Sequence, residues 1–183
     1  MNNIFLEEEQ HHVFSWNKLG NIKEGRGDLG EEMPVLVYRL LEYSMNHVLA
    51  EEFGTEKADE LFRKAGHKAG TEFARNKLDL NVDLNGLLAM LQRLLKELKI
   101  GILRVERIEE AGDSIVLTVA EDLDCSGLPP TGEVVCHFDE GFIAGILETY
   151  TEKPYLVREV DCWAAGDRVC RFCCTAGTER TDG

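Results

Sequence analysis

The sequence predicts an α+β fold, because its hydrophobic pattern changes period once along the chain. Between residues 34 and 98, apolar residues recur at spacings of three and four, which is typical of amphipathic helices. From Gly101 onward they alternate, which indicates β-strands. We therefore expect a mostly antiparallel sheet of about five strands, packed against three N-terminal helices and one later helix.

Three helices are predicted in the first half of the chain. The first covers residues 34–53 and ends at Gly54, and Thr55 is placed to cap a second helix over 56–77. Asp83 is placed to cap a third, leucine-rich helix over 84–98. Apolar stripes face the core on all three. The stripe of the first helix comprises Val37, Leu41, Met45, Val48 and Leu49.

Five strands and one helix are expected in the second half. Residues 102–109 and 114–121 form a hairpin, and 133–137 form a third strand. A helix over 140–150 follows, with Asp139 as its cap. Residues 155–162 and 168–174 form the last hairpin around the turn 163–167. Gly66 and Gly70 in the second helix, and Gly141 and Gly145 in the later one, allow close helix approach.

The length of 183 residues suits a single domain. We place an N-terminal arm at 1–30, one ligand-binding domain at 31–175 and a disordered tail at 176–183. The arm carries Phe5, Phe14 and Trp16 without an evident place in the core. This exposed apolar surface predicts a homodimer. His11 and His12 are interpreted as a surface pair, since a metal site needs three or four ligands.

Composition excludes several classes of partner. The net charge of -14 argues against nucleic acid and against an anionic membrane surface. No apolar run reaches the roughly 18 residues of a membrane span. The N-terminus lacks the features of a signal peptide, and six cysteines are then expected in a reducing cytoplasm, free or metal-bound.

A Gly-x-Gly-x-x-Gly pattern at Gly25, Gly27 and Gly30 is typical of dinucleotide sites only when a buried strand precedes it. Here the preceding residues are polar, and Glu31 and Glu32 would repel a pyrophosphate. We interpret the pattern as a flexible link and expect no tight nicotinamide or flavin binding.

The region 133–172 contains the chemistry of most interest. Cys136, Glu159, Cys162 and Cys170 supply three thiols and one carboxylate, which are ligand types that zinc accepts. Ordinary buried cysteines with a surface glutamate are the alternative. Cys125 is interpreted as a free loop thiol, because four ligands already complete a tetrahedron.

These residues resemble a known family. The pattern Cys136-x4-Gly141-Phe142-x2-Gly145, followed by Glu159-x2-Cys162-x3-Gly166-Asp167-x2-Cys170-x-Phe172, is similar to the C-terminal half of the 4-vinyl reductase domain family. That family includes sensor domains of aromatic-responsive transcriptional activators and is distantly similar to vesicle-tethering subunits. The resemblance implies a structural zinc on Cys136, Glu159, Cys162 and Cys170. It also implies a paired sensor domain.

Small-molecule binding is the function we expect. The resemblance implies an apolar pocket for a hydrophobic or aromatic ligand, and strand and helix periods turn Ile115, Leu117, Phe142 and Ile146 inward to line it. An enzyme that reduces a vinyl group on a tetrapyrrole is one alternative, although no electron-donor site is evident. A dimeric scaffold is another. His137 is expected to point away from the thiols, and Trp163 to cover the metal.

Overall fold

The computed structural model describes residues 14–109 and 112–177. It divides into two units, Met1–Met33 and Pro34–Gly183. The first unit contains a short 3-10 helix, η1 (Trp16–Leu19), and one turn of helix, α2 (Ile22–Gly25), so the glycine pattern follows a helix. Most of the predicted arm, including Phe5, His11 and His12, lies outside the described residues, as do positions 178–183 of the predicted tail.

The second unit contains the predicted helices with nearly the expected bounds. These are α3 (Val35–Phe53), α4 (Thr55–Lys77), α5 (Leu84–Glu97) and a later helix, α6 (His137–Thr151). The predicted cap of α5 is confirmed, because the Asp83 side chain accepts the backbone N–H of Gly86. Thr55 is the first residue of α4 rather than its cap, and Gly54 joins α3 to α4 at a φ of 85° that favours glycine. None of the described helices has the length and apolar character that a membrane crossing requires.

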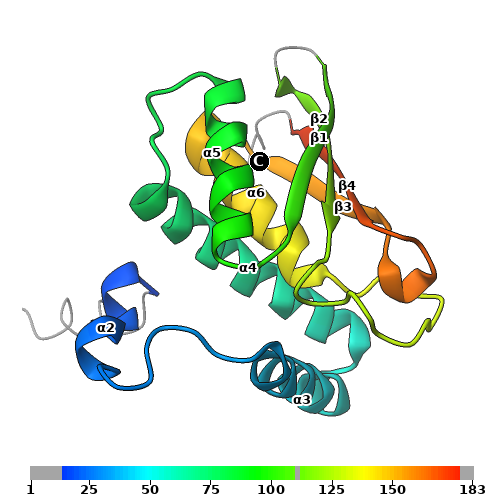
Figure 1. Ribbon diagram of the computed structural model, residues 1–183. Helices are drawn as coiled ribbons and strands as arrows, with labels where there is room; N and C mark the ends of the chain where they lie inside the picture. Colours follow the sequence, from blue (N-terminus) through cyan, green and yellow to red (C-terminus); the bar gives the residue numbers. More distant parts are fainter. Residues whose placement is uncertain (1–13, 110–111, 178–183) are drawn as a thin grey trace, which may run out of the picture. The chain divides into compact units, whose positions relative to one another are not determined.

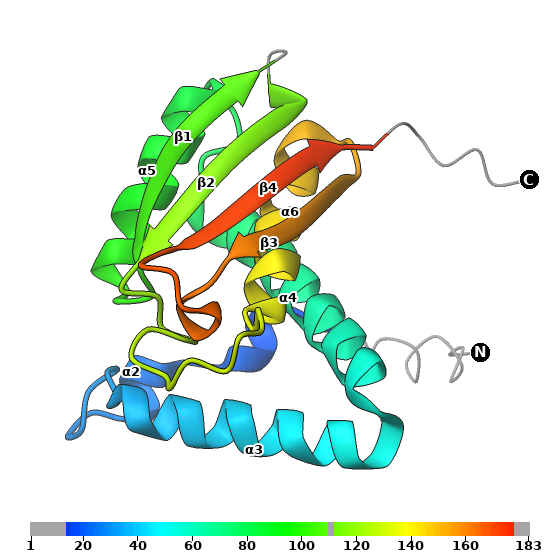
Figure 2. The same ribbon diagram turned by 90° about the vertical axis from the view of Figure 1, so that its right-hand side faces the viewer.

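Four antiparallel strands form one sheet in the order β1-β2-β4-β3. They are β1 (Ile102–Glu109), β2 (Ser114–Ala120), β3 (Tyr155–Asp161) and β4 (Cys170–Ala176). Helices α5 and α6 cover the same face of this sheet (Figure 2), and α4 packs on the outer side of α6 (Figure 1). This arrangement confirms the α+β class. The fully buried core side chains include Leu87, Leu88, Ile115, Leu117, Ile146, Leu147 and Phe172.

The predicted fifth strand at 133–137 is wrong. The preceding segment is held by the turn after β3, where Ala164 O accepts the N–H groups of Thr131 and Gly132. Cys136 then stands at the N-cap of α6, which begins at His137, so Asp139 lies inside the helix rather than at its cap. The N–H of Cys136 goes to the Glu159 carboxylate instead of to a neighbouring strand.

Side chains of α6 occupy the outer edge of the sheet at β3. Glu140 Oε1 accepts the backbone N–H of Glu159 at 2.8 Å, and Glu148 Oε1 accepts that of Tyr155 at 2.9 Å. Both N–H groups point away from β4, and a further strand would need them as donors. These two carboxylates therefore end the sheet at β3.

Helices α4 and α6 cross in very close contact, as their glycines predict. A Cβ atom at Gly66 would overlap the carbonyl oxygen of Phe138, and one at Gly70 would overlap that of Phe142. In return, Cβ atoms on α6 at Gly141 and Gly145 would overlap carbonyl oxygens of α4. Glycine is required because each helix lies directly on the backbone of the other.

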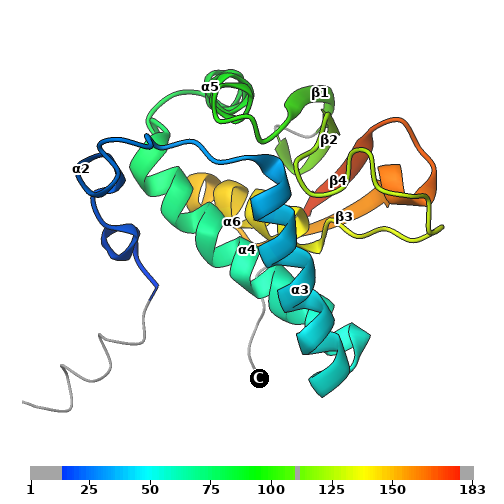
Figure 3. The same cartoon turned by 60° about the horizontal axis from the view of Figure 1, so that its bottom comes forward.

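Helix α3 packs with its polar side inward, which corrects the expectation that its apolar stripe faces the core. Tyr38, Arg39 and Tyr43 bind the loop 122–126, whereas no residue of α3 is fully buried. The predicted stripe is at least half exposed at Val37, Leu41, Met45 and Val48. α3 and α4 meet at a sharp corner at Gly54 (Figure 3).

Candidate metal centre

Four cysteine thiols meet behind the β3–β4 hairpin. The sulfur atoms of Cys125, Cys136, Cys162 and Cys170 all lie within 4.8 Å of one another. Cys136 Sγ is 3.9 Å from Cys162 Sγ and 3.8 Å from Cys170 Sγ, and Cys125 Sγ is 3.1 Å from Cys170 Sγ. All four side chains are buried and none forms a disulfide.

The loop that carries Cys125 is held from two sides. Within the loop, Asp122 Oδ1 accepts the N–H groups of Asp124 and Cys125. From α3, Arg39 donates to the carbonyl oxygens of Leu123 and Ser126, and the Tyr43 hydroxyl donates to the carbonyl oxygen of Asp124. The polar side of α3 thus fixes the position of one thiol of the group.

The other three thiols come from the ends of regular elements. Cys136 is the N-cap of α6, Cys162 begins the turn after β3, and Cys170 begins β4. Asp167 Oδ2 accepts the N–H of Cys162 at 3.0 Å and so closes the turn between the two hairpin cysteines. The indole N–H of Trp163 donates to Leu128 O at 3.0 Å, so Trp163 ties this turn to the loop that follows Cys125.

Glu159 lies beside the thiol group. Its Oε2 accepts the N–H of Cys136 at 3.0 Å, while its Oε1 is buried without a hydrogen-bond partner. Burial, followed by the charge of Cys162, raises the pKa of Glu159 to about 8. Glu159 is therefore positioned against the group through Cys136, although the four mutually close donors are all sulfur.

The thiols influence one another strongly. Hydrogen bonds from Cys125, Cys136 and Cys170 lower the pKa of Cys162, and the same kind of contact with Cys125 and Cys162 raises the pKa of Cys136. One thiolate is thus stabilised by its protonated neighbours. A divalent cation would favour ionisation of all four, because its charge replaces those protons.

The spacing suits tetrahedral zinc. With Zn–S bonds of about 2.3 Å, the sulfur–sulfur distance in a tetrahedron is about 3.8 Å. The two Cys136 distances agree with that value, whereas the Cys125–Cys170 pair would have to open by about 0.7 Å from its 3.1 Å. Four buried sulfurs at this spacing therefore fit a zinc ion.

The sequence analysis left Cys125 out of the group. It lies in a Gly- and Pro-containing loop with no periodic pattern to place it, and its only signal is that it is a fourth cysteine near the other three. His137, expected on a strand, lies in the first turn of α6 and contacts Arg63 and Asp59 instead of the thiols. A second group, Asp122, Cys136 and Asp139, adjoins the first through Cys136.

The residues expected to line an apolar pocket lie in the core between β2 and α6. Ile115, Leu117 and Ile146 are at most 1% exposed. Phe142 is half-buried, stacks on Phe138 and meets Phe73 edge to face. A ligand at these four residues would have to displace core packing.

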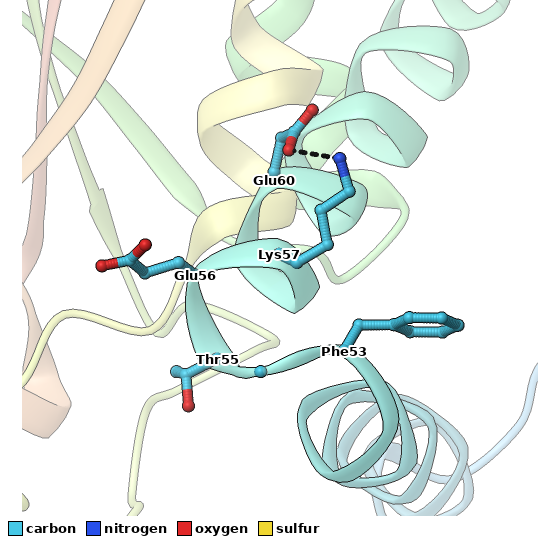
Figure 4. Close-up of a pocket in the computed structure, with 6 residues that line it drawn as sticks. Phe53, Thr55, Glu56, Lys57 and Glu60 are labelled. Carbon is cyan, nitrogen blue, oxygen red and sulfur yellow. Dashed lines mark hydrogen bonds and ion pairs between the residues drawn. The ribbon is translucent and has the colours of Figure 1, made fainter.

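Surface clefts occur elsewhere. One, of about 560 Å³, lies at the corner between α3 and α4, where Lys57 and Glu60 pair at 2.7 Å (Figure 4). Phe53 projects beside it with its ring 63% exposed. Another, of about 520 Å³, lies between α3, α4 and the segment 133–137. The second cleft borders Cys136 in sequence and is therefore closer to the metal centre.

Residues 115–177 match the family model of the 4-vinyl reductase domain. The matched segment contains the four thiols and Glu159. The resemblance to the 4-vinyl reductase domain family is therefore confirmed.

Among curated proteins, an uncharacterized protein of Methanocaldococcus jannaschii is 33% identical over 106 residues. The match covers 58% of this chain and 60% of that protein, so the chain spans less than two thirds of its relative. Solved structures share the fold at low identity. The phenol-responsive sensory domain of the transcription activator PoxR, solved with phenol, has a TM-score of 0.59 at 17% identity and covers 80% of this chain and 76% of its own.

A vinyl-4-reductase family protein from Methanocaldococcus jannaschii is a second structural neighbour. Its TM-score is 0.57 at 15% identity, and the alignment covers 82% of this chain and 85% of the other. Both likenesses extend beyond residues 115–177 into the N-terminal helices. They identify the same fold in all three proteins.

Proposed function

We propose that this chain is a zinc-containing, sensor-type domain that binds a small molecule. The observation that carries the proposal is the group of four buried thiols, which is a donor set for a soft or borderline divalent metal. The family match and the fold shared with a phenol-responsive sensory domain support the small-molecule part. Zinc bound by four protein ligands is structural, because no position remains for substrate.

The zinc ion would join three segments that are distant in sequence. Cys125 belongs to the loop held by α3, Cys136 to the start of α6, and Cys162 and Cys170 to the β3–β4 hairpin. Metal binding would therefore contribute folding free energy to this half of the domain.

Two residues compete for the fourth ligand position. The sequence predicts Glu159, whereas the proximity of the sulfurs supports Cys125. We assign Cys125 to the metal and leave Glu159 as the acceptor for the Cys136 N–H, a contact that orients a metal ligand from outside the coordination shell.

Substitution of zinc by Co²⁺ tests this assignment, since the thiolate-to-cobalt absorption grows with the number of sulfurs bound. We expect Cys125→Ser to weaken that band, and Glu159→Gln and Cys173→Ser to leave it unchanged. Weakening in Glu159→Gln, with none in Cys125→Ser, would restore the carboxylate as ligand. Absence of metal from protein purified under reducing conditions, by elemental analysis, would overturn the metal centre altogether.

A homodimer is also proposed, now through α3. The outward side of this helix exposes Leu36 by 68% and Leu40 by 63%, while its polar side is committed to the loop 122–126. Contiguous apolar surface of this kind marks an interaction site. Leu40→Glu should give a monomer in light scattering, and Leu98→Glu, on an exposed site after α5, should not. Dissociation by deletion of residues 1–29 alone would place the interface on the arm instead.

A further inference from the structure

The cleft between α3, α4 and the segment 133–137 has the chemistry of a binding site for a cation. It measures about 520 Å³, and its lining includes Glu42, Tyr43, Asp59, Phe62, Glu133 and His137. Neither Lys nor Arg is among its lining residues. Three carboxylates thus face a cavity large enough for a small organic molecule.

One of these carboxylates lacks a donor. Glu42 Oε2 is buried and accepts no hydrogen bond, and behind it Asp124, only 4% exposed, has an Oδ2 in the same condition. The nearest guanidinium, that of Arg39, donates to the carbonyl oxygens of Leu123 and Ser126. A buried carboxylate oxygen is costly without a donor, so this wall of the cleft is complementary to an N–H group or a cation.

The remaining carboxylates differ in how far they are compensated. Asp59 Oδ2 lies 3.3 Å from His137 Nε2, and Arg63 lies on the other side of that ring, 2.9 Å from Nδ1. Glu133, in contrast, is exposed at the rim. Within the described chain, the carboxylates of Glu42, Asp59 and Glu133 are not among the groups of donors that converge closely enough for a metal ion. Their separation favours a larger, organic cation.

Apolar and aromatic groups complete the lining. Tyr43 and Phe62 are half-buried, and Val134 and Val135 lie between them and the metal centre in sequence. The hydroxyl of Tyr43 is bound to Asp124 O at 3.1 Å, which fixes the position of its ring. Aromatic faces combined with carboxylates are the groups that recognise an ammonium on an apolar body.

We propose that this cleft binds an organic cation, a primary or quaternary ammonium attached to an aromatic or aliphatic group. The proposal rests on the proposed small-molecule function and names its ligand class. Glu42 receives the cationic head, Glu133 attracts it at the rim, and Tyr43 and Phe62 contact the apolar body. Val135 and His137, which also line the cleft, flank Cys136, so the bound molecule lies next to a metal ligand in the chain.

Calorimetry with the metal-loaded full chain tests the proposal. The compounds are phenethylammonium and benzyltrimethylammonium, compared with neutral phenol and anionic benzoate. We expect binding of both ammonium compounds, weaker or absent binding of the other two, and at least a tenfold loss of ammonium affinity in Glu42→Gln. Glu97→Gln on α5 removes the same charge at a distant, exposed position and should change nothing.

Glu133→Gln serves as a second variant, because this exposed residue is not required for folding, and it should weaken ammonium binding severalfold. Equal losses in Glu42→Gln and Glu97→Gln would show attraction to overall charge only and would overturn the site. Binding of phenol without binding of either ammonium would overturn the cation assignment and leave the sensor function standing. Absence of binding by all four compounds would also refute this assignment, while metal content decides the metal centre separately.

Discussion

Replacement of Gly141 by alanine tests the contact between α4 and α6 most directly. The new Cβ would meet Arg63 O, Arg63 C and His67 N, all backbone atoms of α4. No flexible side chain is available to move aside, so the two helices would have to separate. Since α6 packs on the sheet, the change would also disturb the contacts of Ile143 and Ile146 with the core.

The size of the effect follows from two opposing terms. Overpacking of a close-packed site costs about 1–3 kcal/mol, and contact with backbone places this case near 3. Alanine gains about 1 kcal/mol over glycine inside a helix. The free energy of unfolding should therefore fall by about 2 kcal/mol, which lowers Tm by about 4–8 °C for a domain of this size.

Thermal and urea unfolding of Gly141→Ala would measure this loss. The exposed Ala65 on α4 provides the control, since Ala65→Gly changes only helix propensity and should cost about 1 kcal/mol. A higher Tm in Gly141→Ala, by the amount that propensity alone provides, would refute the close crossing of the two helices.

Three further changes have defined outcomes. Burial, followed by the charge of Asp124, raises the pKa of Glu42 to about 8, so the folded chain holds this proton between about pH 4.5 and 8 while the unfolded chain releases it. The free energy of unfolding should fall as pH rises through this window, and urea titrations should show a weaker dependence in Glu42→Gln. Asp83→Ala removes the cap of α5 and should lower stability by about 1 kcal/mol in urea unfolding, with metal content unchanged. Cys170→Ser should lose metal and thermal stability together, and full zinc occupancy in this variant would contradict its role as a ligand.

The sequence was informative where local chemistry determines structure. Alternating apolar residues marked four strands, and Asp83 marked the start of α5, because both signals arise within a few residues of the chain. The four glycines of the α4–α6 crossing were visible for the same reason, since small residues four apart form one helix face. Three of the four clustered thiols were found through the spacing of a hairpin and the helix before it.

The sequence was uninformative where distant segments determine structure. Residues 133–137 alternate like a strand, but the edge of β3 is already occupied by Glu140 and Glu148, and Cys136 donates to a side chain. Cys125 joins the thiol group only because α3 holds its loop. The apolar stripe of α3 has helical period, and period alone does not tell which side faces the protein.

The two carboxylates that end the sheet at β3 also restrict how copies of this chain associate. An unprotected edge strand is a template on which another chain can form a β-ladder, which leads to strand exchange or fibres. At β3 the required donors are satisfied internally, and at β1, the opposite edge, charged residues and a register shift between Val105 and Arg107 disturb the ladder. Helical surfaces are thus the route by which this fold assembles with a partner while remaining resistant to β-aggregation.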